Sequence, residues 1–432
     1  MTRNSIFQNA KWIIVCKVIQ SLIQLLIGMI TARYLGPSNY GLISYAASLV
    51  AFAVPIMQLG LTAILVQECV TRPEEEGAVM GTGLGMSMIS GLACMVGVFA
   101  FVSVANFEEP TTILVCTLYS VSIFFQATEL LQYWFQARLL SKYASLAALG
   151  AYLVVSAYKI SLLVTGKSIY WFALTHAVEY ACTGILLLGA YRHAGGGKLS
   201  FSRKLAGQMF RKSKYYILAN LMVTVFQHTD QVMLKMMAGN AENGFYTTAI
   251  TCSIITQFVF LAVIDSARPV ILEARRTSWE AFEQKLVGLY SVIIYAVLLQ
   301  SIGFFLFAKL VVGILYGDQY APAVQVLQIL VWQTPFSYMG SIRNIWILAE
   351  EKHHVLWRIN LCGVGANVVL NALLIPHWGA CGAAFASVVT QFVTNLAVGF
   401  VSPSIRDNNR LLLRGLNPRN LLEFLRKLRE YL

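Results

Sequence analysis

Apolar runs of about 20 residues recur along the whole 432-residue chain, separated by short polar stretches. Runs of this length are typical of helices that cross a membrane, whereas the strands of a membrane barrel alternate over shorter segments. The pattern therefore predicts an all-α integral membrane protein with about twelve spans. They are expected at residues 12–32, 41–66, 78–104, 112–135, 144–165, 168–190, 215–237, 244–264, 286–308, 324–348, 355–375 and 379–401.

The distribution of positive charge supports twelve spans. With the N-terminus placed in the cytoplasm, 26 of the 32 lysines and arginines fall inside, 4 outside and 2 within spans. Membrane proteins retain positive residues on the cytoplasmic side, so both termini are predicted to be cytoplasmic. The net charge of +12 thus reports topology, and nucleic-acid binding is not expected.

A repeated turn divides the chain into two halves. The segment "GPSNYGLISYAA" begins at Gly36, and "GNAENGFYTTAI" begins at Gly239, an offset of 203 residues. Each follows the first span of a half, and its glycines suit a tight turn with positive φ. Two six-helix lobes related by a pseudo-two-fold parallel repeat are therefore predicted, with a cavity between them. The expected layout is an N-terminal lobe (1–191), a basic cytoplasmic linker (192–214), a C-terminal lobe (215–404) and an amphipathic cytoplasmic tail (405–432).

Two segments outside the spans have helical periodicity. Phe201, Leu205 and Met209 predict a short helix lying on the membrane surface within the linker. In the tail, leucines fall on one face of "NPRNLLEFLRKLREYL", surrounded by basic residues. We interpret it as a helix lying in the plane of the anionic cytoplasmic leaflet, with a partner-binding helix as the alternative.

Polar side chains inside spans are costly and are functional candidates by default. The predicted substrate pathway comprises Lys17, Gln20, Gln24, Arg33, Glu129, Lys159, His176, Glu179, Gln227, His228, Asp230, Gln231 and Lys235. The carboxylates Glu129, Glu179 and Asp230 are candidates for ion coupling. The competing interpretation is hydrogen bonding between packed helices, which we favour for Asn360, Asn367 and Asn371. Arg33 and Lys159 are also placed to extend toward lipid headgroups.

Enzymatic and metal chemistry find no support in the sequence. The eight cysteines are scattered singly, without a metal-ligand or disulfide pattern. No nucleotide-binding loop or catalytic triad is present, and the external loops are short. We predict a protein that is not an enzyme and has no cofactor or metal.

Five segments together resemble one protein family. They are "ARYLGPSNYGLISYAASL" (32–49) with "QLGLTAILVQE" (58–68), "LLQYWFQARLLSKYASL" (130–146), "DQVMLKMMAGNAENGFYTTA" (230–249), "LYGDQYAPAVQVLQIL" (315–330) and "NALLIPHWGACGAAFASVVTQ" (371–391). In this order they resemble the Wzx-type polysaccharide repeat-unit flippases of the multidrug/oligosaccharidyl-lipid/polysaccharide exporter superfamily.

The resemblance implies a function in the bacterial inner membrane. Such proteins move undecaprenyl-pyrophosphate-linked oligosaccharide, such as an O-antigen repeat unit, from the cytoplasmic to the periplasmic leaflet. The expected partners are this substrate, membrane lipids and the polysaccharide polymerase machinery. Coupling to a proton or sodium gradient is a further hypothesis. The alternatives are a cation-coupled drug or metabolite efflux antiporter of the same superfamily and, less favoured, a membrane-embedded polymerase or acyltransferase.

Overall fold

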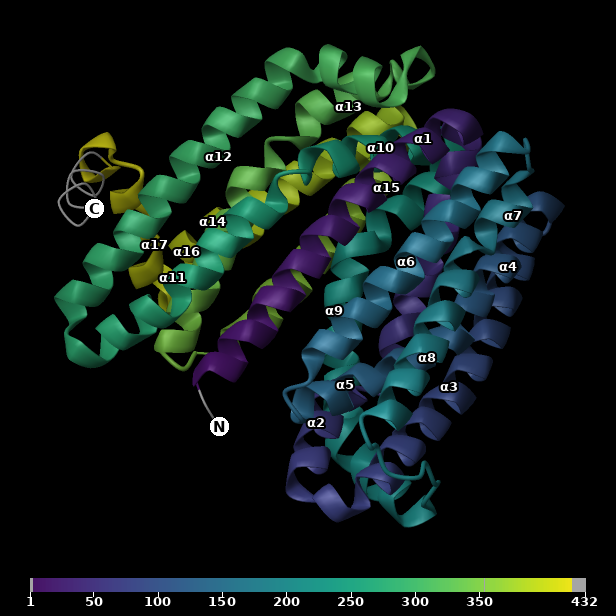
Figure 1. The fold of residues 1–432 in the computed structure, drawn as a ribbon. Coiled ribbons are helices and arrows are strands. Elements are labelled where there is room, and N and C mark those ends of the chain that lie inside the picture. The colour runs from purple at the N-terminus through teal and green to yellow at the C-terminus, as the bar shows by residue number, and fades with distance from the viewer. Residues whose placement is uncertain (1–2, 353, 422–432) are drawn as a thin grey trace. The chain divides into compact units, whose positions relative to one another are not determined.

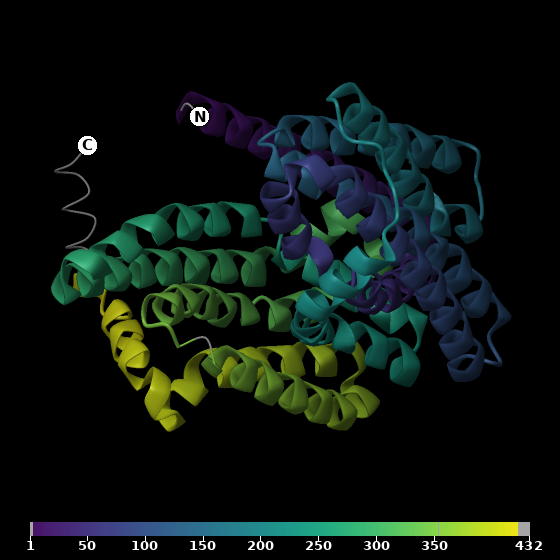
Figure 2. The same cartoon turned by 90° about the horizontal axis from the view of Figure 1, so that it is seen from below.

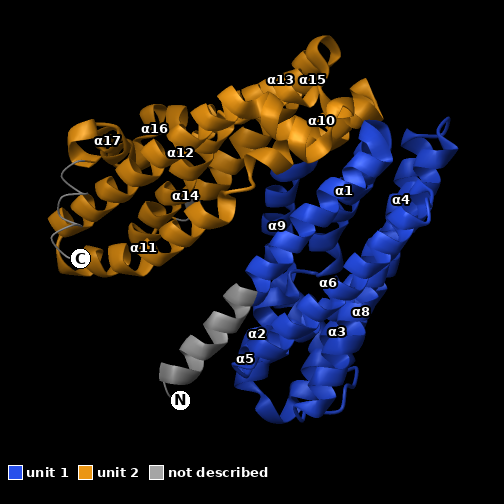
Figure 3. Cartoon of the chain, turned by 45° about the horizontal axis from the view of Figure 1, so that its top comes forward, with its two compact units in different colours: residues 1–228 blue, residues 229–432 orange. Residues whose placement is uncertain are grey.

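The computed structural model describes residues 3–352 and 354–421, and within them the regular elements are all helical. The chain divides into two compact units, residues 1–228 and 229–432 (Figure 3). This division falls inside one continuous helix, α9 (Arg203–Ala238), rather than in the expected linker at 192–214. The first part of α9 packs with the N-terminal unit, unit 1, and its last ten residues belong to the C-terminal unit, unit 2.

Figure 1 traces the helices of both units. Unit 1 contains α1 (Arg3–Met57), α2 (Leu61–Thr71), α3 (Glu76–Ala105), α4 (Pro110–Gln126), α5 (Leu131–Ala137), α6 (Ser141–Val164), α7 (Ile169–Ala173), α8 (Thr175–His193) and the first part of α9. Unit 2 contains the end of α9, α10 (Asn240–Ser253), α11 (Gln257–Thr277), α12 (Trp279–Tyr316), α13 (Ala323–Leu330), α14 (Gln333–Ala349), α15 (His354–Phe392), α16 (Val398–Val401) and α17 (Arg406–Gly415).

The apolar helices account for much of the predicted membrane topology. Among the described residues, seven helical segments are long and apolar enough to span a membrane, and the bent pair α10–α11 adds an eighth. Two of the seven, Cys16–Thr71 and Val355–Val401, contain a glycine with non-helical geometry, Gly36 and Gly379. Each thus joins two helices, as the predicted spans require. Twelve spans stay a prediction, because α9 and the divided pair α13–α14 do not pass as single apolar helices.

The paired turns have the expected backbone conformation. Gly36 has φ 73° and ψ 168°, and Gly239 has φ 97° and ψ 178°. This region of backbone space is open essentially to glycine alone. The prediction of positive φ at both turns is confirmed, and the same geometry recurs at the same place in each half of the sequence.

The amphipathic start of α9 packs against protein. Leu205 and Met209, which were expected on a separate surface helix, are buried in a core with Leu65, Trp134 and Tyr191. The preceding residues 194–202 lie along α3, where Ser200 N–H donates to the Gly77 carbonyl at 3.3 Å. A Cβ at Gly77 or Gly81 would collide with this segment. The predicted surface-lying helix is therefore wrong: its apolar face meets the helices of unit 1.

Two buried carboxylates fix the same end of unit 1. Glu76 accepts two hydrogen bonds from Arg138, at 3.1 and 2.7 Å. Glu68 accepts from Lys212 of α9 at 2.5 Å. Both carboxylates are about 95% buried, and Glu68 also pairs with Arg72 at 3.3 Å, so the loss of Arg138 would leave the Glu76 charge uncompensated. These pairs join α9 to α2, and α3 to the residue that follows α5.

The tail begins with a helix docked on unit 2. Helix α17 lies across the ends of the other helices of its unit, in yellow in Figure 2. Leu411 and Leu412 of α17 are buried together with α12 residues in one core. Residues 406–415 therefore pack within the chain. Most of the membrane-lying helix predicted at residues 417–432, including Leu425 and Leu428, lies outside the described residues, so it stays a prediction.

The turn glycine gives a test of backbone strain. Gly239→Ala should lower the free energy of unfolding by about 1–3 kcal/mol, because the site has space for a Cβ but the wrong φ for alanine. Gly303→Ala in α12 is the control, since its added Cβ also meets no atom within 4 Å and its backbone is helical. That control should be neutral or stabilising by about 0.5–1 kcal/mol. The measurement is the melting temperature of both variants in detergent. Equal melting temperatures would contradict the assignment of backbone strain to position 239.

Candidate functional site

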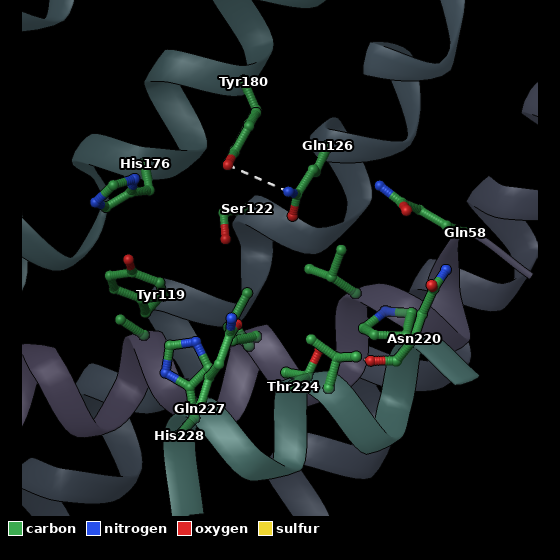
Figure 4. Close-up of a pocket in the computed structure, with 16 residues that line it drawn as sticks. Gln58, Tyr119, Ser122, Gln126, His176, Tyr180, Asn220, Thr224, Gln227 and His228 are labelled. Atoms are coloured by element: carbon green, nitrogen blue, oxygen red, sulfur yellow. Dashed lines mark hydrogen bonds between the residues drawn. The ribbon is translucent and has the colours of Figure 1, made fainter. Parts of the chain in front are cut away.

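A cavity lies within unit 1, between the second half of α1 and helices α4, α8 and α9 (Figure 4). Its volume is about 500 Å³, within the usual range for a small-molecule site. Its wall combines apolar side chains of α1 with polar side chains of α4, α8 and α9 and of Gln58, which follows α1. The polar lining residues are Gln58, Tyr119, Ser122, Gln126, His176, Tyr180, Asn220, Thr224, Gln227 and His228.

The wall holds hydrogen-bonding groups without fixed charge. None of its 16 residues is an aspartate, glutamate, lysine or arginine. Amides, hydroxyls, phenols and imidazoles can each donate or accept hydrogen bonds, and the aromatic rings offer apolar faces. Such a surface matches an uncharged ligand that has many hydroxyl groups and some apolar faces.

Helix α4 carries two polar groups whose hydrogen-bonding capacity is not fully used within the described chain. The amide nitrogen of Gln126 donates to the Tyr180 hydroxyl at 3.2 Å, as the dashed line in Figure 4 shows. The Gln126 carbonyl oxygen and the Ser122 hydroxyl are buried without a hydrogen-bond partner in the described chain. Buried polar atoms are normally satisfied, so these two are available to a ligand or water.

A cluster of charged residues adjoins this cavity. His176, in the wall, lies 3.4 Å from Glu179 through its Nδ1 atom and stacks near Tyr119. The Glu179 carboxylate interacts electrostatically with Lys159 and with Glu129. Glu129 in turn interacts electrostatically with Lys17. Glu129 sits in a 3₁₀ turn, residues 127–130, that interrupts the helix between α4 and α5. The structure thus groups five of the predicted pathway residues around one side of the cavity.

The predicted stripe on α1 does not form part of this wall. Lys17, Gln24 and Arg33 are exposed on unit 1, and Gln20 is half-buried. Gln227 and His228 of α9, two residues of the predicted pathway, line the cavity. Two later pathway residues of α9, Gln231 and Lys235, are buried and belong to unit 2.

Unit 2 holds a second polar site, around Asp230. This carboxylate is 7% exposed and accepts hydrogen bonds from Tyr246, Ser387 and Asn371, each at 2.5 Å. Asn371 also donates to the Asn367 side-chain oxygen at 3.0 Å. The three partners of Asp230 come from α10 and from both halves of α15. A buried carboxylate among hydroxyl and amide oxygens is a donor set that suits a proton or a hard cation.

Sequence reasoning did not identify several members of these sites. Gln126 lies three residues before the predicted pathway residue Glu129, and Asn371 was assigned to helix packing. The sequence therefore marked both positions as polar residues inside a predicted span. Tyr246 and Ser387 had none, because they meet Asp230 only through contacts distant in sequence. Ser387 is 157 residues from Asp230 along the chain.

A matched pair of serines tests the unused hydroxyl. Ser120 and Ser122 are both fully buried on α4, but only Ser120 has a hydrogen-bond partner, the Thr117 carbonyl at 2.8 Å. Ser120→Ala should therefore destabilise unit 1 by about 0.5–1.5 kcal/mol more than Ser122→Ala does. Chemical denaturation of the two variants measures the difference. A Ser122→Ala variant that is the less stable of the two would show that its hydroxyl has a structural partner.

Comparisons with known proteins agree with this architecture. The family described as polysaccharide biosynthesis protein matches residues 6–275, more than half of the chain. The chain is 21% identical over 409 residues to the capsular polysaccharide biosynthesis protein CapF of Staphylococcus aureus, covering 89% of this chain and 96% of that protein. It is 23% identical over 196 residues to the probable low-salt glycan biosynthesis flippase Agl15 of Haloferax volcanii, covering 45% and 42%.

Two of the curated relatives, Agl15 among them, are matched over less than half of their own length. Among solved structures, the lipid II flippase MurJ in an inward closed conformation is similar over 95% of this chain and 89% of its own. The TM-score is 0.71 at 12% identity, which shows a shared fold. The chain belongs to the polysaccharide biosynthesis protein family and has the all-α fold of a multi-pass membrane protein.

Proposed function

We propose that the protein is a flippase that moves undecaprenyl-pyrophosphate-linked oligosaccharide from the cytoplasmic to the periplasmic leaflet. The observation that carries this proposal is the cavity of unit 1, which sits among apolar helices and has a polar wall free of carboxylates, ammonium and guanidinium groups. The names of the relatives, a glycan biosynthesis flippase and a lipid II flippase, support the same substrate class.

The physical problem is the sugar headgroup. Moving a hydroxyl into hydrocarbon without a hydrogen-bond partner has an unfavourable free energy of several kilocalories per mole, whereas the apolar polyprenyl tail is soluble in hydrocarbon. A wall of amides and hydroxyls replaces the lost water while the tail stays in lipid. Alternating access of the site to the two leaflets then moves the headgroup across. Lys17, Lys159 and Arg33 supply positive charge on unit 1 for the pyrophosphate.

Coupling to an ion gradient is assigned to the Asp230 site. A charge buried in a membrane protein is costly and needs a compensating ion or proton. Asp230 has hydroxyl and amide oxygens around it and no ion pair to a described residue of unit 2, so sodium or a proton would supply the compensation. Glu129 and Glu179, next to the cavity, are the secondary candidates for coupling.

The rival functions fit the cavity less well. An efflux antiporter for cationic drugs would be expected to place a carboxylate in the wall, and none of the 16 lining residues is acidic. A polymerase or acyltransferase would need catalytic groups that approach a bound acceptor. The inner-membrane location, cytoplasmic termini and association with polymerase machinery belong to the flippase proposal.

Flipping can be measured directly in proteoliposomes. A fluorescent polyprenyl-pyrophosphate oligosaccharide is placed in one leaflet, and its accessibility to an external quencher reports transfer. Gln126→Leu should slow transfer about fivefold to tenfold. The lost hydrogen bond contributes about 1 kcal/mol to the binding free energy, and its loss weakens the affinity by a factor of about that size. Gln136→Leu, at an exposed position of α5, is the control and should transfer normally.

Two outcomes would contradict the proposal. Equal transfer by Gln126→Leu and the native protein would remove the cavity from the route. Transport of a fluorescent organic cation by a native protein that does not flip the oligosaccharide would establish the efflux antiporter instead.

The coupling site has its own test. Asp230→Asn should abolish the response of flipping to an imposed sodium or pH gradient, because the neutral amide no longer needs a cation. Asp265→Asn, an exposed carboxylate paired with Arg268, is the control and should keep the response. Native flipping that ignores both gradients would overturn the coupling assignment and leave the flippase proposal in place.

A further inference from the structure

A π-helical turn interrupts the helix that carries Ser387. Residues Val393–Ala397 form this turn between α15 and α16. The N–H of Val398 is directed at the carbonyls of Leu396 and Val393, the latter five residues back, and not at that of Thr394. The carbonyl of Thr394 is therefore not used by Val398, its partner in a regular α-helix. Turns of this kind hold one extra residue and are often found at functional sites.

Two side chains from other helices occupy carbonyls of this turn. Arg343 of α14 donates through Nη1 to the Thr394 carbonyl at 2.6 Å. Asn409 of α17 donates to the Leu396 carbonyl at 2.9 Å. Gly399 leaves room for the Asn409 amide, since a Cβ at that position would collide with it. The turn is thus held from two sides by groups that are separate from its own helix.

Arg343 is an unusual residue to find in this place. It is 4% exposed, its Nε has no hydrogen-bond partner, and no described carboxylate forms an ion pair with it. A buried guanidinium needs compensation, and the carbonyl of Thr394 supplies it through one strong hydrogen bond. The charge of Arg343 is therefore matched to the carbonyl that the π turn presents to it.

Helix α17 is itself fastened to unit 2. The Tyr290 hydroxyl donates to Asn408 at 3.0 Å, and the Ser291 hydroxyl donates to the Gly415 carbonyl at 2.7 Å. Arg414 pairs with Glu283 at 2.9 Å. Asn409 is consequently presented to the turn by a helix with several attachments of its own (Figures 1 and 2).

The π turn sets the register of Ser387. This serine lies seven residues before Thr394 on the same helix and bonds both Asp230 and Tyr246. If the turn relaxed to α geometry, everything before it would rotate by about 100° and shift by about 1.5 Å relative to everything after it. Such a rotation would carry the Ser387 hydroxyl away from Asp230.

We propose that Arg343 and Asn409 are positioning residues, which hold the π turn and thereby keep Ser387 at Asp230. Through Asn409, the docking of α17 governs the geometry of the buried carboxylate site. The consequence for ion coupling rests on the function proposed above for Asp230, whereas the positional claim stands on the contacts of unit 2 alone.

The test follows the exposure of position 387. In a chain with the eight native cysteines replaced, Ser387→Cys reports its burial by its rate of reaction with a small thiol reagent. Labelling should be slow, because Ser387 is 5% exposed, and should rise at least tenfold with Asn409→Leu. Deleting Ala397 from the Asn409→Leu chain removes the extra residue and should restore slow labelling. A merely destabilising substitution would not be rescued by a deletion.

Two further variants complete the experiment. Arg414→Gln is the control: it removes only the partly exposed ion pair with Glu283, leaves Asn409 and the buried attachments of α17 in place, and should label slowly. Arg343→Met removes the other donor together with its buried charge, so it should fold and should also label fast. Slow labelling in both Asn409→Leu and Arg343→Met would overturn the proposal, as would fast labelling that the deletion fails to reverse.

Gradient-driven flipping by the same variants with Ser387 intact separates the two proposals. Loss of the gradient response in Asn409→Leu and its return on deletion of Ala397 would support both. Labelling that changes as expected while gradient-driven flipping does not would support the positioning role and overturn the coupling role of Asp230.

Discussion

Hydrocarbon offers no hydrogen bonds, so every polar group that this chain carries between its apolar surfaces has to find its partner inside the protein. The described structure follows this constraint closely. Glu68 and Glu76 are buried against Lys212 and Arg138, and Asp230 is surrounded by three donors. Even the carbonyls of the π turn are bonded by side chains from neighbouring helices. Among the groups left over, the Ser122 hydroxyl and the Gln126 side-chain carbonyl line the cavity of unit 1.

Features that depend on local sequence could be predicted. The conformation of Gly36 and Gly239 follows from a turn that only glycine can form, and the His176–Glu179 pair follows from three-residue spacing on a helix. The all-helical membrane fold follows from runs of apolar residues. Each of these conclusions needs only a few neighbouring residues.

The remaining features depend on contacts that the sequence does not record. Leu205 and Met209 have the periodicity of a helix that lies on a membrane, and a helix that packs on protein has the same periodicity. Ser387 resembles any small residue of a spanning helix until α15 folds back and brings it to Asp230. The amino-acid sequence of the π turn cannot be distinguished from that of an ordinary α-helix, because the extra residue shows only in the pattern of backbone hydrogen bonds.

The uncharged wall of the cavity also has a consequence for how this protein can change over generations. A binding site built on a buried ion pair can alter its ligand only by replacing both charges together. In a wall of amides and hydroxyls, exchanging one glutamine, asparagine or serine alters the pattern of donors and acceptors without leaving an uncompensated charge behind. The ligand preference of such a cavity can then shift in single mutational steps.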